Sequence, residues 1–200
     1  MDTEIIKAIA PLGAMIVAAC GLFLAWRTQR EGQLRKADVL KWALESIESL
    51  QTAVLLIDRR CHEADLPDEE LATDLYDSCS RLSVLAEQGR LYFRNQKHAH
   101  GAAKEIAYRG LRPEILDQLI IGFYVCQTFF QSTTDERWKL RYLMLQAELR
   151  FVSLVQAEVG RSKIASSIAG ASGDGVNLRR LLANIDSRKL ENSSHRFRLR

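Results

Sequence analysis

The fold is decided by residues 33–61, QLRKADVLKWALESIESLQTAVLLIDRRC, a stretch that contains neither proline nor glycine. Apolar residues recur in it at spacings of three and four, which is the period of one face of an α-helix. They are Leu40, Leu44, Ile47, Leu50, Val54, Ile57 and Cys61. A heptad pattern continued along this stretch would place Gln51 and Asp58 on the seam. The stretch therefore predicts a helix packed in a globular bundle rather than a long dimeric coiled coil.

Three more helices are predicted after this one. The second carries Leu71, Leu75, Leu82 and Leu85 and is expected to end near Gly89. The third is a mostly buried helix over 114–130, and the fourth covers 136–160, with Gly160 as its stop. No alternating strand pattern is present, and 11 Gly and 3 Pro are too few for a turn-rich β fold. We expect an all-α fold, a bundle of about four helices.

The N-terminal part of the chain has a different pattern. Residues 8–26, AIAPLGAMIVAACGLFLAW, are 19 consecutive residues without a charge, enough to cross a bilayer core of roughly 30 Å. Basic residues follow this run more than they precede it, so the rule that positive charge stays inside places the C-terminal part in the cytoplasm. The sequence thus predicts a single-pass protein, in a bacterial inner membrane, with its N-terminus outside.

Two alternatives to the membrane helix stay open. Residues 17–20, VAAC, are similar to a lipoprotein processing site with Cys20 as the acylated residue, although the apolar run continues beyond that cysteine. The other alternative is an ordinary buried helix. The expected organisation is a short external N-terminus (1–7), a transmembrane helix (8–26), a cytoplasmic helical bundle (27–161), and a flexible linker with a short helix and a basic tail (162–200).

The charges are grouped in blocks along the chain. The formal net charge is only +3, but residues 63–77 carry seven acids and no lysine or arginine. Residues 81–113 carry seven bases against two acids. Such blocks set the electrostatic field of particular faces and leave the fold unaffected. We expect nucleic acid not to be a partner, because nothing in the basic tail is suited to reading bases.

The candidate site lies in residues 89–113, where arginines alternate with aromatic residues. Guanidinium groups in such a setting suit phosphate or carboxylate groups. The residues predicted to bind an anion or a partner are Arg90, Arg94, Arg109 and Arg112. The alternative interpretation is structural: the aromatic side chains hold an irregular connection against the bundle, and the arginines pair with the neighbouring acids.

Few residues suggest catalysis. His98 and His100, or the run Cys61, His62 and Glu63, contain metal-ligand types, but neither has the second half of a zinc spacing. The glycines of 170–175 lack the order of a phosphate-binding loop and read as a linker. We therefore predict no catalytic residue, no cofactor and no metal.

The predicted function is that of a membrane-anchored interaction, scaffold or regulatory module at the cytoplasmic face. Its expected partners are the lipid bilayer, a protein or a second copy of the chain, and anionic lipid headgroups. The first alternative is a membrane-perturbing effector activated when its cytoplasmic domain oligomerises, with Gly13 and Gly21 on the helix contact. The second is a metal-dependent or nucleotide-handling enzyme.

Overall fold

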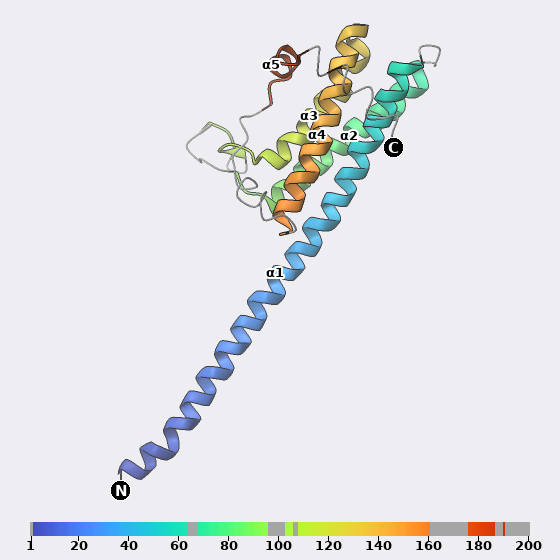
Figure 1. Ribbon diagram of the computed structural model, residues 1–200. Helices are drawn as coiled ribbons and strands as arrows, with labels where there is room; N and C mark the ends of the chain where they lie inside the picture. Colours follow the sequence, from blue (N-terminus) through green and yellow to red (C-terminus); the bar gives the residue numbers. More distant parts are fainter. Residues whose placement is uncertain are drawn as a thin grey trace. The chain divides into compact units, whose positions relative to one another are not determined.

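The computed structural model describes residues 2–63, 68–95, 103–105, 108–160, 176–186 and 190. Within the first helix, it describes the side chains of 20–27 and from 36 onward. Two compact units are present, Met1–Val39 and Leu40–Arg200. The helices are α1 (Asp2–His62), α2 (Asp68–Tyr92), α3 (Glu114–Thr128), α4 (Thr134–Glu158) and α5 (Leu178–Ala183), with a short 3₁₀ turn at Phe129–Gln131 (Figure 1). The all-α prediction agrees with this structure, which has no strand in its described part.

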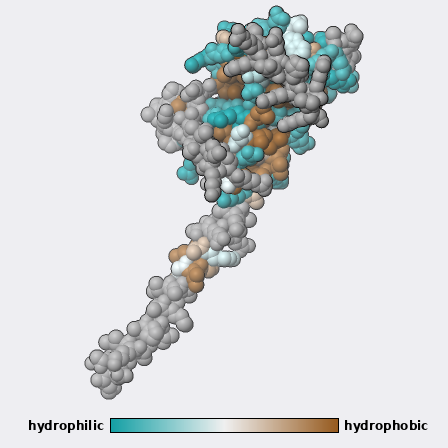
Figure 2. All heavy atoms as spheres, in the orientation of Figure 1, coloured by the Kyte–Doolittle hydropathy of each residue, from teal (hydrophilic) through white to brown (hydrophobic). Residues whose placement is uncertain are grey.

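The membrane-spanning helix is not supported. Among the residues that the structure describes, no helix is both long and apolar enough to cross a membrane. The described apolar side chains before Arg27 begin at Cys20 and cover about 10 Å of helix, a third of a bilayer core (Figure 2). The side chains of 8–19 lie outside the described residues. This finding contradicts the predicted transmembrane helix at 8–26, the single-pass topology and the inner-membrane location.

The unit Leu40–Arg200 is organised around a core to which four helices contribute. Gly122 of α3 marks the point where they meet, because a Cβ built there would lie 2.9 Å from Leu50 of α1 and 3.2 Å from Leu82 of α2. The same atom would lie 3.5 Å from Met144 of α4. Each of these three side chains is fully buried. The four-helix bundle predicted from the apolar periodicity is thus present in this unit.

The buried face of α1 differs in detail from the predicted stripe. Leu44 is 59% exposed, whereas Trp42 is buried and donates a hydrogen bond from Nε1 to the Leu85 carbonyl of α2 at 2.9 Å. The Trp42 ring also contacts Phe151 of α4 edge to face, with 5.5 Å between centroids. An indole is large enough to fill the space between three helices, so it sets the rotation of α1 and turns Leu44 outward.

Gly89 does not end α2 as predicted. The helix continues to Tyr92, and a Cβ at Gly89 would overlap Leu116 of α3 and lie 2.7 Å from the Trp42 ring. The glycine therefore allows three helices to approach closely, and its backbone is helical.

The ends of α4 follow the sequence signals. Thr133 accepts a hydrogen bond from the Glu136 N–H, and the Glu136 side chain accepts one from the Thr133 N–H, which completes a capping box. At the other end, Gly160 has φ +74°, the left-handed conformation that stops a helix, which confirms the predicted stop. The predicted linker over 162–175 and the basic tail from 191 lie outside the described residues. Between them, α5 packs Leu178, Leu181 and Leu182 against the core.

Candidate functional site

A pocket of about 610 Å³ lies in the described part of the predicted arginine region. It lies where the C-terminal end of α2, residues 104–105 and 108–112, and α3 come together. Its basic lining residues are Arg90, Lys104 and Arg112, and its acidic ones are Glu105 and Asp117. The rest of the lining is largely apolar or aromatic and includes Tyr108, Leu111, Ile120, Tyr124 and Val176. Three basic and two acidic side chains thus share this pocket with apolar and aromatic ones.

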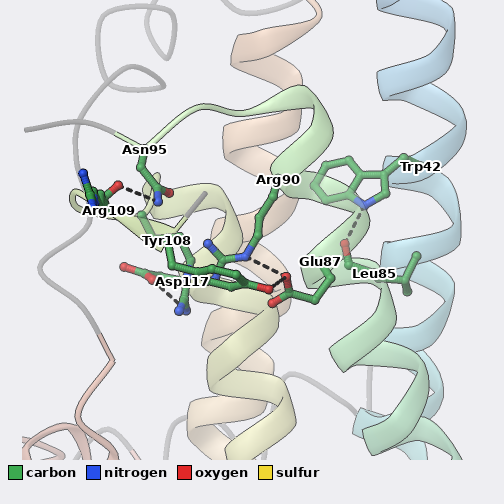
Figure 3. A network of polar contacts seen from close by, with 9 residues as sticks. Trp42, Leu85, Glu87, Arg90, Asn95, Tyr108, Arg109 and Asp117 are labelled. Atoms are coloured by element: carbon green, nitrogen blue, oxygen red, sulfur yellow. Dashed lines mark hydrogen bonds and ion pairs between the residues drawn. The ribbon is translucent and has the colours of Figure 1, made fainter. Parts of the chain in front are cut away.

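Arg90 is held by two contacts (Figure 3). Its Nε lies 2.9 Å from the Glu87 carboxylate, one turn earlier on α2. Its guanidinium also lies over the Tyr108 ring, 4.5 Å from the centroid, in a cation–π contact. The Tyr108 hydroxyl donates to the same Glu87 oxygen at 3.2 Å. Glu87 and Tyr108 thus fix the guanidinium plane of Arg90, in an orientation that suits edge-on binding of a carboxylate or phosphate.

Arg112 is less fully neutralised than Arg90. Its Nη1 donates to Asp117 at 3.5 Å, near the outer limit of a hydrogen bond. Its buried Nε, like that of Arg90, has no hydrogen-bond partner among the described residues. Burial lowers the pKa of Arg112, Asp117 raises it, and the nearby positive charge of Arg90 lowers it again. Since a guanidinium keeps its proton in proteins, the lowered pKa means that positive charge is costly at this position.

The other two predicted arginines are not in the pocket. Arg109 donates from Nε to the Lys104 carbonyl at 2.9 Å, and its own carbonyl accepts from the Asn95 amide at 2.9 Å (Figure 3). Arg109 therefore has a structural role in the connection between α2 and α3. Arg94 is exposed and does not line the pocket. The structure brings together Arg90 and Arg112, and separates Arg94 and Arg109 from them.

Several residues that line the pocket were not predicted from the sequence. Asp117 and Tyr124 lie one and three turns into α3, where the sequence predicts a buried helix, and their role depends on the way α3 packs beside Arg112. Asp117 is only 5% exposed, so its carboxylate needs a partner, and Arg112 is five residues earlier. A buried acid in an otherwise apolar helix next to a basic loop is the signal that points to this pair.

The histidines that the sequence offered only as residues of metal-ligand type are placed as follows. His98 and His100 lie outside the described residues. His62 packs edge to face on Trp138, with 5.2 Å between centroids, and its Nδ1 lies 2.8 Å from the Asp58 carbonyl. In the part of the chain that the structure describes, no group of three or more His, Cys, Asp or Glu residues is arranged to hold a metal ion.

Comparison with known proteins identifies no relative. No family model, no curated protein and no solved structure matches the chain.

Proposed function

We propose that this chain is a helical binding module that recognises an anionic group carried on an apolar body. The observation that carries the proposal is the convergence of Arg90 and Arg112, from two different elements, on one pocket. Burial is the main cause that lowers the pKa of Arg112; Asp117 raises this pKa, and the positive charge of Arg90 lowers it to a smaller extent. A bound anion relieves the repulsion between the two arginines, because it attracts both guanidinium groups at once.

The lining also indicates the shape of the ligand. Two half-exposed rings, Tyr108 and Tyr124, and the aliphatic residues Leu111, Ile120 and Val176 cover much of the pocket. An ion without an apolar part would leave these surfaces in contact with water. A ligand such as an aryl or alkyl phosphate or carboxylate, including a side chain of that kind on a partner protein, would contact both parts of the pocket.

The test uses phenyl phosphate as the probe and isothermal titration of the full chain. We expect wild-type protein to bind, and Arg112→Gln to weaken binding at least about tenfold, because a hydrogen bond to a charged group contributes about 1.5–3 kcal/mol. Arg94→Gln is the matched control, since it removes the same charge from the same region outside the pocket. Equal losses for the two variants, with unchanged circular dichroism, would contradict the proposal.

Inorganic phosphate provides a second arm of the test. It presents the same oxygens without the ring, so we expect weaker binding than for phenyl phosphate. Equal affinity for the two probes would show that the apolar lining does not contribute.

A further inference from the structure

A second pocket lies between α1 and α2, and its chemistry is the opposite of the first. It measures about 270 Å³ and is lined by Ser49, Thr52, Leu56, Asp74, Asp77, Ser78 and Arg81. The residues from α1 and those from α2 each recur at spacings of three or four, so each set lies on one helix face. Asp74 and Asp77 are exposed at the opening, whereas Ser49 and Ser78 are buried beneath them.

The base of this pocket holds an unsatisfied hydroxyl. Ser49 is only 2% exposed, and its Oγ has no hydrogen-bond partner among the described residues. Ser46, three residues earlier on the same helix, satisfies its hydroxyl by donating to the Trp42 carbonyl at 2.9 Å. A buried hydroxyl without a partner costs free energy. We therefore expect a ligand of this pocket to form a hydrogen bond with the Ser49 hydroxyl.

The groups that face this pocket are mainly hydrogen-bond acceptors. When they are ionised, the carboxylates of Asp74 and Asp77 can only accept hydrogen bonds. Ser78 already donates its proton to the Asp74 carbonyl at 3.0 Å, and Thr52 donates to the Glu48 carbonyl at 2.9 Å. Both hydroxyls therefore have lone pairs left to offer. Arg81, the one cation in the lining, lies 3.6 Å from Glu48. A ligand for this pocket must therefore donate hydrogen bonds and carry positive charge.

We infer that this pocket binds a primary ammonium group, which inserts between Asp74 and Asp77 and donates to the Ser49 hydroxyl. An ammonium is a compact cation with three N–H donors, which matches two carboxylates above one hydroxyl. The ammonium can come from a small amine or from a lysine side chain of a partner protein. This site is separate from the anion pocket and does not depend on the function proposed for it.

The experiment follows amide resonances of the full chain during titration with n-butylammonium. We expect saturable shifts in segments 49–56 and 74–81. Tetramethylammonium is the control, because it carries the same charge but has no N–H donor, and we expect it to give no saturable shift there. Absence of saturation with n-butylammonium at millimolar concentrations, or equal binding of both cations, would overturn the inference.

One pair of variants locates the site. Asp77→Asn is expected to weaken n-butylammonium binding about tenfold, because it removes a charge-assisted hydrogen bond. Glu70→Gln removes one exposed acid from the same helix outside the pocket, and should leave the affinity unchanged. Equal losses of affinity in the two variants would show that binding depends only on the overall negative charge of the helix surface, which would overturn the proposed site.

Ser49→Ala distinguishes binding from folding. It removes the unsatisfied hydroxyl, so the thermal midpoint should not fall, while affinity for n-butylammonium should fall about threefold or more. Unchanged affinity would remove Ser49 from the site and contradict the inference. A parallel titration with N-acetyl-lysine methylamide identifies the source: tighter binding than n-butylammonium favours a lysine of a partner, and weaker binding favours a small amine.

Discussion

Asp58 of α1 and Arg141 of α4 form the most deeply buried ion pair in the described part of the chain. Arg141 is 1% exposed and donates from Nε to the Asp58 carboxylate, and its guanidinium lies 5.5 Å from the Trp138 ring centroid. A buried ion pair adds little stability relative to apolar residues of the same size, but removing one partner leaves the other charge uncompensated. The pair therefore favours the packing in which these faces of α1 and α4 meet.

Replacement of Arg141 tests this role. We expect Arg141→Ala to lower the free energy of unfolding by about 2–4 kcal/mol, somewhat less than for a fully buried pair because the Asp58 side chain is 23% exposed. Arg59→Ala is the matched control, since its pair with Glu63 is 56% exposed on both sides, and it should cost less than about 0.5 kcal/mol. Urea unfolding measures both values, and equal losses would contradict the assignment.

Cys61 provides a second prediction for single residues. Burial raises the pKa of its thiol to about 11, although the charge of Arg141 counteracts part of this effect. At pH 8 the thiolate fraction is then roughly a hundredfold below that of an ordinary cysteine. We expect iodoacetamide to modify exposed Cys20 much faster than Cys61, as followed by mass spectrometry. Similar rates for the two thiols in folded protein would show that Cys61 is not desolvated.

At the scale of helices, Gly89 determines how closely α1, α2 and α3 approach. We expect Gly89→Ala to destabilise the protein by about 1–3 kcal/mol, because the added methyl group overlaps Leu116 and the Trp42 ring. Gly21→Ala is the control: nothing lies within 4 Å of a Cβ there, so the substitution should be neutral or increase helicity. Thermal unfolding followed by circular dichroism separates the two, and an unchanged midpoint for Gly89→Ala would contradict this packing.

The capping box of α4 gives a pH-dependent prediction. The hydrogen bonds from the Thr133 backbone and side chain lower the pKa of Glu136. A carboxyl group whose pKa is lower in the folded state stabilises the fold above its unfolded pKa, and this contribution is lost as the pH falls through the folded pKa. Glu136→Gln should therefore cost stability at pH 7 and progressively less toward pH 3. A cost that does not change between these pH values in urea titrations would contradict the assignment.

The positions of the helices could largely be predicted from the sequence, because apolar periodicity reports directly which face of a helix is buried. Leu71, Leu75, Leu82 and Leu85 are all buried, as predicted. The rotation of α1 could not be predicted, because it depends on Trp42 filling a space that only three assembled helices create. The end of α2 at Gly89 was also predicted incorrectly. Glycine is favoured both at the end of a helix and where helices approach closely, and the sequence alone does not distinguish the two roles.

At the scale of the whole molecule, the predicted membrane helix was the main error. An uncharged run of 19 residues is the usual sign of a spanning segment, but no helix in the described residues meets the length and apolarity needed to cross a membrane. For the candidate site, two of the four predicted arginines, Arg90 and Arg112, line one pocket. Which arginines converge depends on the turn through Gly110, whose φ is +91°, and on the packing of α3 beside the connection. Neither is encoded in local spacing.

The described residues of the unit Leu40–Arg200 thus line both the Arg90–Arg112 pocket, which carries the proposed function, and the pocket of Asp74 and Asp77, to which we assign a cation. The most direct test is an amide chemical-shift map of the full chain titrated with phenyl phosphate. We predict saturable shifts concentrated at 90–95, 108–112 and 117–124, and their loss in Arg90→Gln. Shifts that never saturate, or that persist unchanged in that variant, would contradict an anion site at Arg90 and Arg112.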